Sequence, residues 1–216
     1  MVKESKELSN DVSQFQRIKD KFHYGLVFQV IRNKLAKIGI EFTPYFRVQE
    51  GIEPTEEPEI EGIKKEYRIE FLYEEDMKEI EINARGYSEN ELLARLKDDK
   101  KCLGLKHFNR IIAFMWIYLK EFNFGHTKVH LKDNEAYLTD MYTIESYRGK
   151  NLAPYLRFKS YDILKNLGYD KIYSVTEYFN SSAIKYKKKL NAINLKLILC
   201  INLFNKIKWN STIKTY

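Results

Sequence analysis

Residues 136–190 contain two segments in which an apolar extended run leads, after a short polar turn, into a helical pattern. Residues 136–144 are rich in β-branched and aromatic side chains, and residues 171–178 form a second such run, so both predict strands. Apolar side chains at helical spacing follow over residues 152–167 and 181–190. Gly168 comes after the first helical pattern, where glycine commonly ends a helix. Strands that each precede a helix predict a mixed α/β fold.

Further strand and helix patterns lie on both sides of this segment. Residues 67–72 alternate as a strand, and residues 101–108 and 111–119 predict two strands joined by a polar turn at residues 109–110. Ser88 and Glu91 have the spacing of a capping box that opens a short helix ending at Leu96. Residues 192–204 predict one strand or a strand pair. The pattern therefore indicates a sheet flanked by helices.

The N-terminal part differs in composition from the rest. Its first twenty residues are polar and predict a loosely docked arm. Apolar positions recur at helical spacing from Phe22 to Ile38, Gly39 ends that pattern, and residues 40–48 read as an extended stretch broken by Pro44. Residues 51–62 are rich in glutamate, proline and glycine, which is typical of a linker. We therefore expect an N-terminal extension over residues 1–62 and a main domain over residues 63–216.

The charge of the chain is unevenly distributed. The formal net charge is +7, and no acidic residue follows Glu177, whereas eight lysines do. Such a basic end attracts phosphorylated small molecules, nucleic acid or an anionic membrane surface. Cys102 and Cys200 read as buried core thiols, which suits a reducing compartment. No apolar run has membrane-spanning length, so we expect a cytoplasmic protein.

One loop, between the strand at 136–144 and the helix at 152–167, favours anion binding. Backbone N–H groups at a helix N-terminus lack partners and carry partial positive charge. Gly149 permits close approach to the backbone, Arg148 and Lys150 add charge, and Asn151 tolerates left-handed backbone. The loop therefore predicts a phosphate site. The alternative is a plain strand–turn–helix junction whose basic side chains face water.

The same loop resembles a known motif. Residues 146–156, with Arg148 first and Ala153 last, resemble the pyrophosphate-binding motif of the GNAT superfamily of N-acetyltransferases, although Asn151 stands where a glycine is usual. Asn180 and Ala183 match a second motif of that family, whose later glycine and phenylalanine are replaced here by Asn191 and Ala192. The resemblance covers residues 65–204.

The resemblance implies a fold and a co-substrate. The implied fold is α/β (α+β), with a mixed, mostly antiparallel central sheet flanked by helices, and the implied co-substrate is acetyl-CoA. The residues that would bind it are Met141, Tyr142, Thr143, Arg148, Gly149, Lys150, Asn151, Leu152, Ala153 and Asn180. We expect no metal, because His126 and His130 fall on turn and strand, where four residues separate side chains by roughly 13 Å.

Acetyl transfer requires removal of a proton from the amine and delivery of a proton to the departing thiolate. The family's thiolate acid is a tyrosine at the position occupied here by Lys187, and Tyr186 lies one residue earlier. Tyr186 is therefore the candidate acid, with helix packing as the alternative interpretation. Glu177 and Asp140 are the candidate bases, with solvated or ion-paired carboxylates as the alternative. We expect the lysine run at residues 187–189 to form a helix face that is exposed to solvent.

These features lead to one functional hypothesis and two alternatives. The hypothesis is an N-acetyltransferase acting on a small, anionic amine acceptor, such as a nucleotide-linked amino sugar, bound in part by Tyr45, Arg47 and Glu50. Those three residues have an alternative interpretation as an extra strand at a sheet edge. The alternative functions are a protein or peptide N-acetyltransferase, and a non-catalytic module that binds nucleic acid or a membrane surface. A homodimer is left open.

Overall fold

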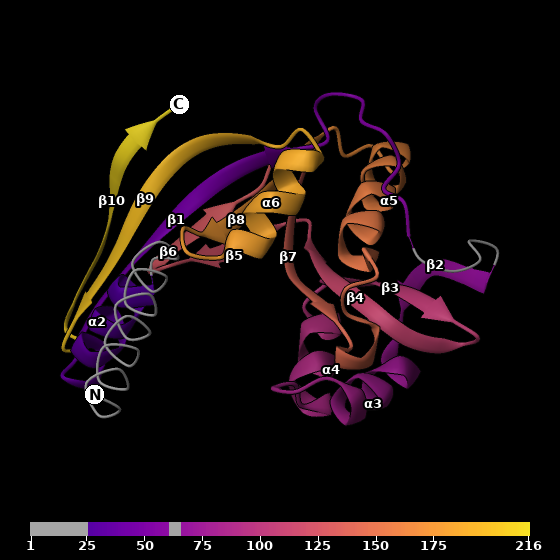
Figure 1. The fold of residues 1–216 in the computed structure, drawn as a ribbon, viewed down its shortest axis with the longest axis horizontal. Coiled ribbons are helices and arrows are strands. Elements are labelled where there is room, and N and C mark those ends of the chain that lie inside the picture. The colour runs from indigo at the N-terminus through magenta and orange to yellow at the C-terminus, as the bar shows by residue number, and fades with distance from the viewer. Residues whose placement is uncertain (1–25, 61–65) are drawn as a thin grey trace, which may run out of the picture.

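The computed structural model describes residues 26–60 and 66–216. These residues form one large sheet and a separate hairpin, with helices on both faces (Figure 1). In sheet order the strands are β10 (Ile207–Thr215), β9 (Ile193–Leu203), β1 (Ile40–Glu50), β8 (Lys171–Glu177), β7 (Glu135–Thr143), β4 (Arg110–Tyr118), β3 (Lys101–His107) and β2 (Tyr67–Leu72). The hairpin consists of β5 (Glu121–Phe124) and β6 (Thr127–His130).

Every neighbouring pair in the large sheet is antiparallel except β7 and β8, which run parallel. The mixed, mostly antiparallel sheet flanked by helices confirms the expected fold class. The parallel pairing is short, because only residues 135–138 of β7 pair with β8, at its residues 171–174. Beyond it β7 stays on β4 and β8 stays on β1, so the sheet divides into two arms (Figure 1).

Four of the five described helices occur close to where the sequence patterns predict them. They are α2 (Leu26–Lys37), α4 (Glu89–Lys97), α5 (Leu152–Asn166) and α6 (Ser181–Lys189). No such pattern was identified for α3 (Glu74–Asn83), and a short 3-10 turn covers Glu145–Tyr147. Ser88 lies at the N-cap of α4 but its side chain makes no capping hydrogen bond. Phe22, where the first helical pattern begins, lies outside the described residues. Among the described helices, none is long and apolar enough to cross a membrane.

The core lies on both faces of β4, whose residues 111–117 are all buried. Met115 and Ile117 face α5, where they pack with Leu156. Phe114 and Trp116 face the opposite way and pack in a second cluster with side chains of α3 and α4. Successive residues of a strand point to opposite faces, so a continuous apolar run is what a strand covered on both sides requires.

The N-terminal strand lies inside the sheet, between β8 and β9, and is not an edge strand. The expected interruption at Pro44 is wrong, because β1 runs unbroken from Ile40 to Glu50. The carbonyl of Pro44 accepts a hydrogen bond from Tyr178, just past the end of β8. In an antiparallel strand the N–H and C=O of one residue point to the same side, so the proline removes no bond from the ladder with β9.

The C-terminal part forms two strands. Residues 193–203 form β9, within the region expected to be a strand or strand pair. The chain then turns at Phe204 and Asn205, both with positive φ, and returns as β10. No strand was predicted for β10. Ile207, Trp209 and Ile213 alternate with polar residues along it, but all three side chains are exposed.

Candidate active site

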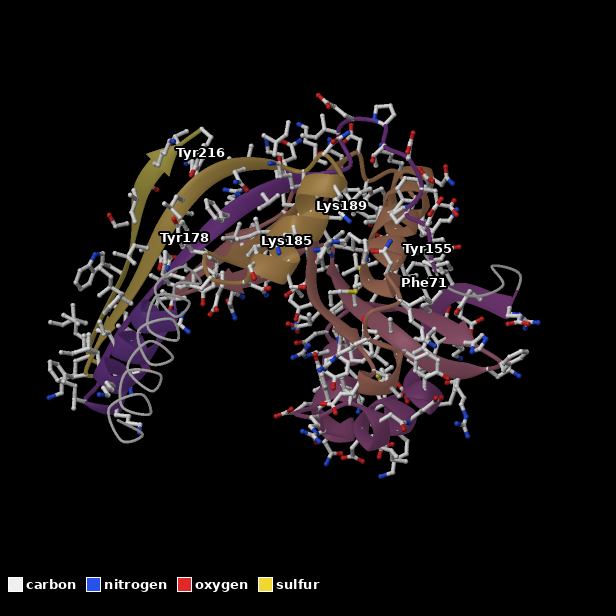
Figure 2. The ribbon with its side chains drawn as sticks, viewed as in Figure 1. Phe71, Tyr155, Tyr178, Lys185, Lys189 and Tyr216 are labelled. Atoms are coloured by element: carbon white, nitrogen blue, oxygen red, sulfur yellow. The ribbon has the colours of Figure 1, made fainter. Side chains whose placement is uncertain are left out.

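A cleft of about 1230 Å³ opens where β7 and β8 separate. Its walls come from β7, the loop before α5, the first turns of α5, the end of β8 and α6. Val175, Thr176 and Glu177 all line it, although successive residues of a strand point to opposite faces. The cleft therefore follows the edge of β8 where that strand has separated from β7. Figure 2 shows Lys185 and Lys189 on α6 and Tyr155 on α5, on the face where these helices lie.

The loop at residues 148–153 has the backbone of an anion site. Gly149 has a φ of 86° and Asn151 a φ of 61°, so the left-handed backbone expected at Asn151 is observed. The first backbone bond of α5 joins the N–H of Tyr155 to the carbonyl of Asn151, so the N–H groups of Leu152 and Ala153 have no helical acceptor. Left-handed residues that alternate with right-handed or extended ones turn successive N–H groups into one concave surface, which binds anions.

Arg148 is held at the edge of this loop. Its Nε donates to the carbonyl of Thr143 at 3.2 Å, and its guanidinium lies 5.5 Å from the centre of the Tyr142 ring. Lys150 does not line the cleft, and its ammonium lies 5.3 Å from the centre of the Tyr147 ring. The other nine expected cofactor residues do line it: Met141, Tyr142, Thr143, Arg148, Gly149, Asn151, Leu152, Ala153 and Asn180.

A bulge in β7 shapes the wall opposite β8. Phe114 pairs with Tyr142 and Trp116 with Thr139, so Met115 faces two residues of β7, Asp140 and Met141. Asp140 has a φ of 49°. A bulge of this kind turns backbone groups out of the ladder, and bulges are common beside active sites. The backbone near Met141 is thereby freed to bind a ligand.

Asn180 has a structural reason for its position in the second motif. Its Oδ1 accepts a hydrogen bond from the N–H of Ala183 at 3.0 Å, so it is the N-cap of α6. This bond fixes the start of the helix that carries Tyr186 and Lys187 into the cleft wall.

The linker at residues 51–60 crosses the ends of both motifs. Asn151 Nδ2 donates to the carbonyl of Glu59 at 2.6 Å, and Asn191 Nδ2 donates to the carbonyl of Pro54 at 3.3 Å. The Lys159 ammonium also meets the Glu57 carboxylate at 2.5 Å. The linker therefore packs along α5 from its N-cap onwards and against the residues that follow α6. Its contact with Asn151 helps to hold that residue in place.

The three candidate catalytic residues all line the cleft. Tyr186 packs against the main core cluster, and burial raises the pKa of its phenol although the adjacent Arg157 opposes this shift. Asp140 is bound by Arg95 at 2.5 Å, which neutralises its charge. Glu177 is 40 % exposed and is 3.8 Å from Arg32, so its carboxylate is the less constrained of the two.

Of the three expected acceptor residues, only Tyr45 lines the cleft. Its neighbours on β1 alternate between faces. Arg47 shares the face of Tyr45 but lies farther along the strand, with its guanidinium 5.2 Å from the centre of the Tyr173 ring. Glu50 points to the opposite face and is 1 % exposed, so it is an interior residue. The expectation that all three side chains share one pocket is therefore not met.

Glu50 instead joins a buried cluster that no sequence pattern predicted. Arg157 Nε lies 2.9 Å from Glu50 Oε2, and Lys187 Nζ lies 3.3 Å from Glu50 Oε1. Tyr161 donates its hydroxyl proton to Glu50 Oε2 at 2.7 Å, and Ser174 also donates to this carboxylate. Lys187 is thus not part of a solvated helix face, whereas Lys188 and Lys189 are exposed. Its position three residues before the buried Leu190 and four after Ala183 is the pattern that could have revealed it.

The pKa values in this cluster reflect its burial. Burial alone would raise the pKa of Glu50, but Arg157 and Lys187 outweigh it and lower the pKa to about 2. Burial is the main cause that lowers the pKa of Lys187, to about 8. The negative charge of Glu50 raises this pKa, but the positive charge of Arg157 opposes that effect. Glu50 is therefore ionised at neutral pH and Lys187 is mostly charged.

The cleft as a whole is positive. Two acidic residues line it, Asp140 and Glu177, and the six basic ones are Arg148, Arg157, Lys185, Lys187, Lys188 and Lys189. A concave surface with this balance attracts anionic ligands. No group of three or more His, Cys, Asp or Glu side chains is placed to hold a metal ion within residues 26–60 and 66–216.

The mixed, mostly antiparallel sheet flanked by helices is the fold that the sequence resemblance implied, and the loop at residues 148–153 lies at the opening between its two arms. The profile of the Acetyltransferase (GNAT) family matches residues 60–191. The chain belongs to this family. Among curated proteins, no significant match to the sequence was found.

Solved structures agree on the fold. A GNAT-family acetyltransferase from Colwellia psychrerythraea superposes with a TM-score of 0.56 at 15% identity, over 78% of this chain and 59% of that one. A GCN5-related N-acetyltransferase from Sphaerobacter thermophilus gives a TM-score of 0.55 at 9% identity, over 84% of this chain and 56% of that one. The chain thus spans less than two thirds of the length of either structure, and at these identities the likeness concerns the fold alone.

Proposed function

We propose that the protein is an N-acetyltransferase that moves the acetyl group of acetyl-CoA to a primary amine of a small, anionic acceptor, such as a nucleotide-linked amino sugar. The observation that carries the proposal is the loop at residues 148–153, whose free N–H groups and Arg148 border a positively charged cleft. A volume of about 1230 Å³ exceeds that of a typical single-ligand pocket, which leaves room for two substrates.

The residues present fit a ligand of the CoA type. Two positive-φ residues and the start of α5 offer N–H donors to a pyrophosphate, and Lys185, Lys188 and Lys189 offer charge to further phosphate. Acetyl-CoA, when bound, supplies an acetyl thioester. The bulge in β7 presents the backbone of Met141 to the opening, where its N–H suits an oxygen that gains negative charge.

Glu177 supports the proton transfer that an amine acceptor requires. An alkylamine is mostly protonated at neutral pH, with a pKa near ~10.4, so it must lose a proton before it attacks. Glu177 lies with Tyr45 at the opening on the side of the sheet away from Thr176, and its carboxylate is partly exposed. We assign it the role of base in preference to Asp140, whose charge is neutralised by Arg95.

The anionic acceptor is proposed from charge. Basic side chains outnumber acidic ones by six to two along the cleft, and three of the six, Lys185, Lys188 and Lys189, lie together on α6. A phosphate on the acceptor would share the attraction of this positive field with the donor phosphates. Turnover of such an acceptor would decrease with ionic strength more steeply than that of an uncharged amine, because salt screens this attraction.

The first test is ligand binding. A ligand that binds only the folded protein stabilises it by RT ln(1 + [L]/Kd), about 2.7 kcal/mol at a hundredfold excess over Kd. We expect CoA and acetyl-CoA to raise the melting temperature, and an acceptor screen by thiol release to favour phosphorylated amines over their unphosphorylated counterparts. A folded, ligand-free sample whose melting temperature is unchanged by millimolar CoA would contradict the proposal.

A matched pair at Asn151 tests the loop. Asn151→Gly is expected to bind CoA as the wild type does, because glycine adopts a φ of 61° readily. Asn151→Val is expected to weaken binding by about tenfold or more, because a β-branched residue is strained there by about 1–3 kcal/mol. Calorimetry on both variants measures the difference. Equal affinities would show that binding does not depend on this backbone conformation.

A further inference from the structure

The buried cluster beside the cleft holds more positive than negative charge. Glu50 is its one carboxylate, whereas Arg157 and Lys187 are both cations, and these three residues are 1 %, 2 % and 5 % exposed. The other groups that face Lys187 or its partners are uncharged. They are Met115 Sδ on β4 and four hydroxyls, those of Ser174 and Thr176 on β8, Tyr161 on α5 and Tyr186 on α6. Burial and Glu50 raise the pKa of Tyr161, and burial raises that of Tyr186, so neither supplies a negative charge at neutral pH.

An interior charge without a counter-charge is costly. Arg157, Lys187 and Thr176 line the cleft, so an anionic atom of a ligand could approach the surplus charge from there. Thr176 lies two residues past Ser174, the last residue of β8 that pairs with β7. The cluster therefore meets the cleft at the point where the two arms separate.

The hydrogen bonds of Lys187 define a route for its proton. An ammonium has three protons, and Lys187 directs them to Ser174 Oγ at 2.6 Å, Thr176 Oγ1 at 2.5 Å and Glu50 Oε1 at 3.3 Å. A threonine hydroxyl accepts and donates at once. Because Thr176 accepts from Lys187, its own proton is available to a second acceptor in the cleft.

We propose, resting on the function proposed above, that Lys187 protonates the departing CoA thiolate through the hydroxyl of Thr176. When the bond between the acyl carbon and sulfur breaks, sulfur keeps the electron pair. Thr176 Oγ1 then gives its proton to sulfur and takes one from Lys187 Nζ, which becomes a neutral amine. Glu50 and Arg157 remain as a balanced pair, so the transfer removes the surplus buried charge, and Lys187 regains a proton from solvent before the next turnover.

The first experiment needs no acceptor. Calorimetry compares the affinity of CoA with that of desulfo-CoA, which lacks the thiol, between pH 6.5 and pH 9. In the wild type we expect CoA to gain about three- to tenfold over desulfo-CoA as the pH approaches 8, because sulfur and Lys187 then share one proton between them, which is the state that the transfer passes through. Lys187→Met is expected to abolish this gain while it still binds desulfo-CoA. An undiminished gain in that variant would overturn the proposal.

The second experiment follows turnover with an acceptor from the screen. Thr176→Val removes the hydroxyl at nearly constant volume and is expected to lower kcat by about 10²-fold, whereas Thr176→Ser is expected to restore it. Both should bind desulfo-CoA as the wild type does. If Thr176→Val keeps full kcat and Tyr186→Phe loses it, the phenol is the acid and the proposal is wrong. If CoA fails to bind the wild type at all, it is the proposed function that fails.

Discussion

Glu50→Gln is expected to lower the free energy of unfolding by about 3–5 kcal/mol, because it leaves two interior cations without a counter-charge. Arg157 and Lys187 contact this carboxylate from α5 and α6, and both are almost completely buried. Urea unfolding followed by circular dichroism measures the change. Glu41→Gln is the matched control, since Glu41 lies on the same strand but is exposed, and surface substitutions usually change stability by about 0.5 kcal/mol or less.

The same cluster predicts how stability changes with pH. The folded pKa of Glu50, about 2, lies below its unfolded value of about 4.3, so its contribution is complete above pH 4.3 and is lost as the pH falls towards 2. The folded pKa of Lys187, about 8, lies below its unfolded value of about 10.4. Between about pH 8 and pH 10.4 the unfolded chain therefore binds more protons at Lys187 than the folded protein does. Through this residue, the free energy of unfolding rises with pH over that range. A Glu50→Gln protein with wild-type stability and wild-type acid sensitivity would contradict the charge balance described here.

Glu177→Gln is expected to lower kcat by about 10²- to 10⁴-fold with little change in CoA affinity, because glutamine is isosteric but cannot take up the amine proton. The reduction should lessen at high pH, where more of the acceptor is already neutral. Steady-state kinetics from pH 6.5 to pH 10 measure both effects, and Glu41→Gln again serves as the control.

Asp140→Asn separates the two candidate bases. It removes the partner of Arg95, so a loss of stability is expected together with a smaller loss of kcat than in Glu177→Gln. The opposite order of kcat values, in two folded variants, would transfer the role of base to Asp140.

Several features of this protein follow from short stretches of sequence. Gly168 at the end of α5 and the positive φ of Asn151 could be predicted from the residue type, because steric limits on φ and ψ act within one or two residues. The helices α5 and α6 and the strands before them could be predicted from the spacing of apolar residues. Asn180 caps α6 through a bond that spans three residues. The anion-binding loop is built from such local contacts, so the sequence was enough to locate it.

Other features depended on the tertiary structure. The alternation of β1 predicts that Arg47 and Glu50 point to opposite faces, but only the position of the strand between β8 and β9 decides which face is interior. Residues far apart in the chain meet in the charged cluster: Arg157 lies 107 positions and Lys187 137 positions after Glu50. Charge and burial at such sites depend on which strands become neighbours, and no local pattern encodes that order. The sequence alone thus determined the loop and its helix, whereas long-range packing decided that a lysine in a basic run would become an interior residue at the opening of the cleft.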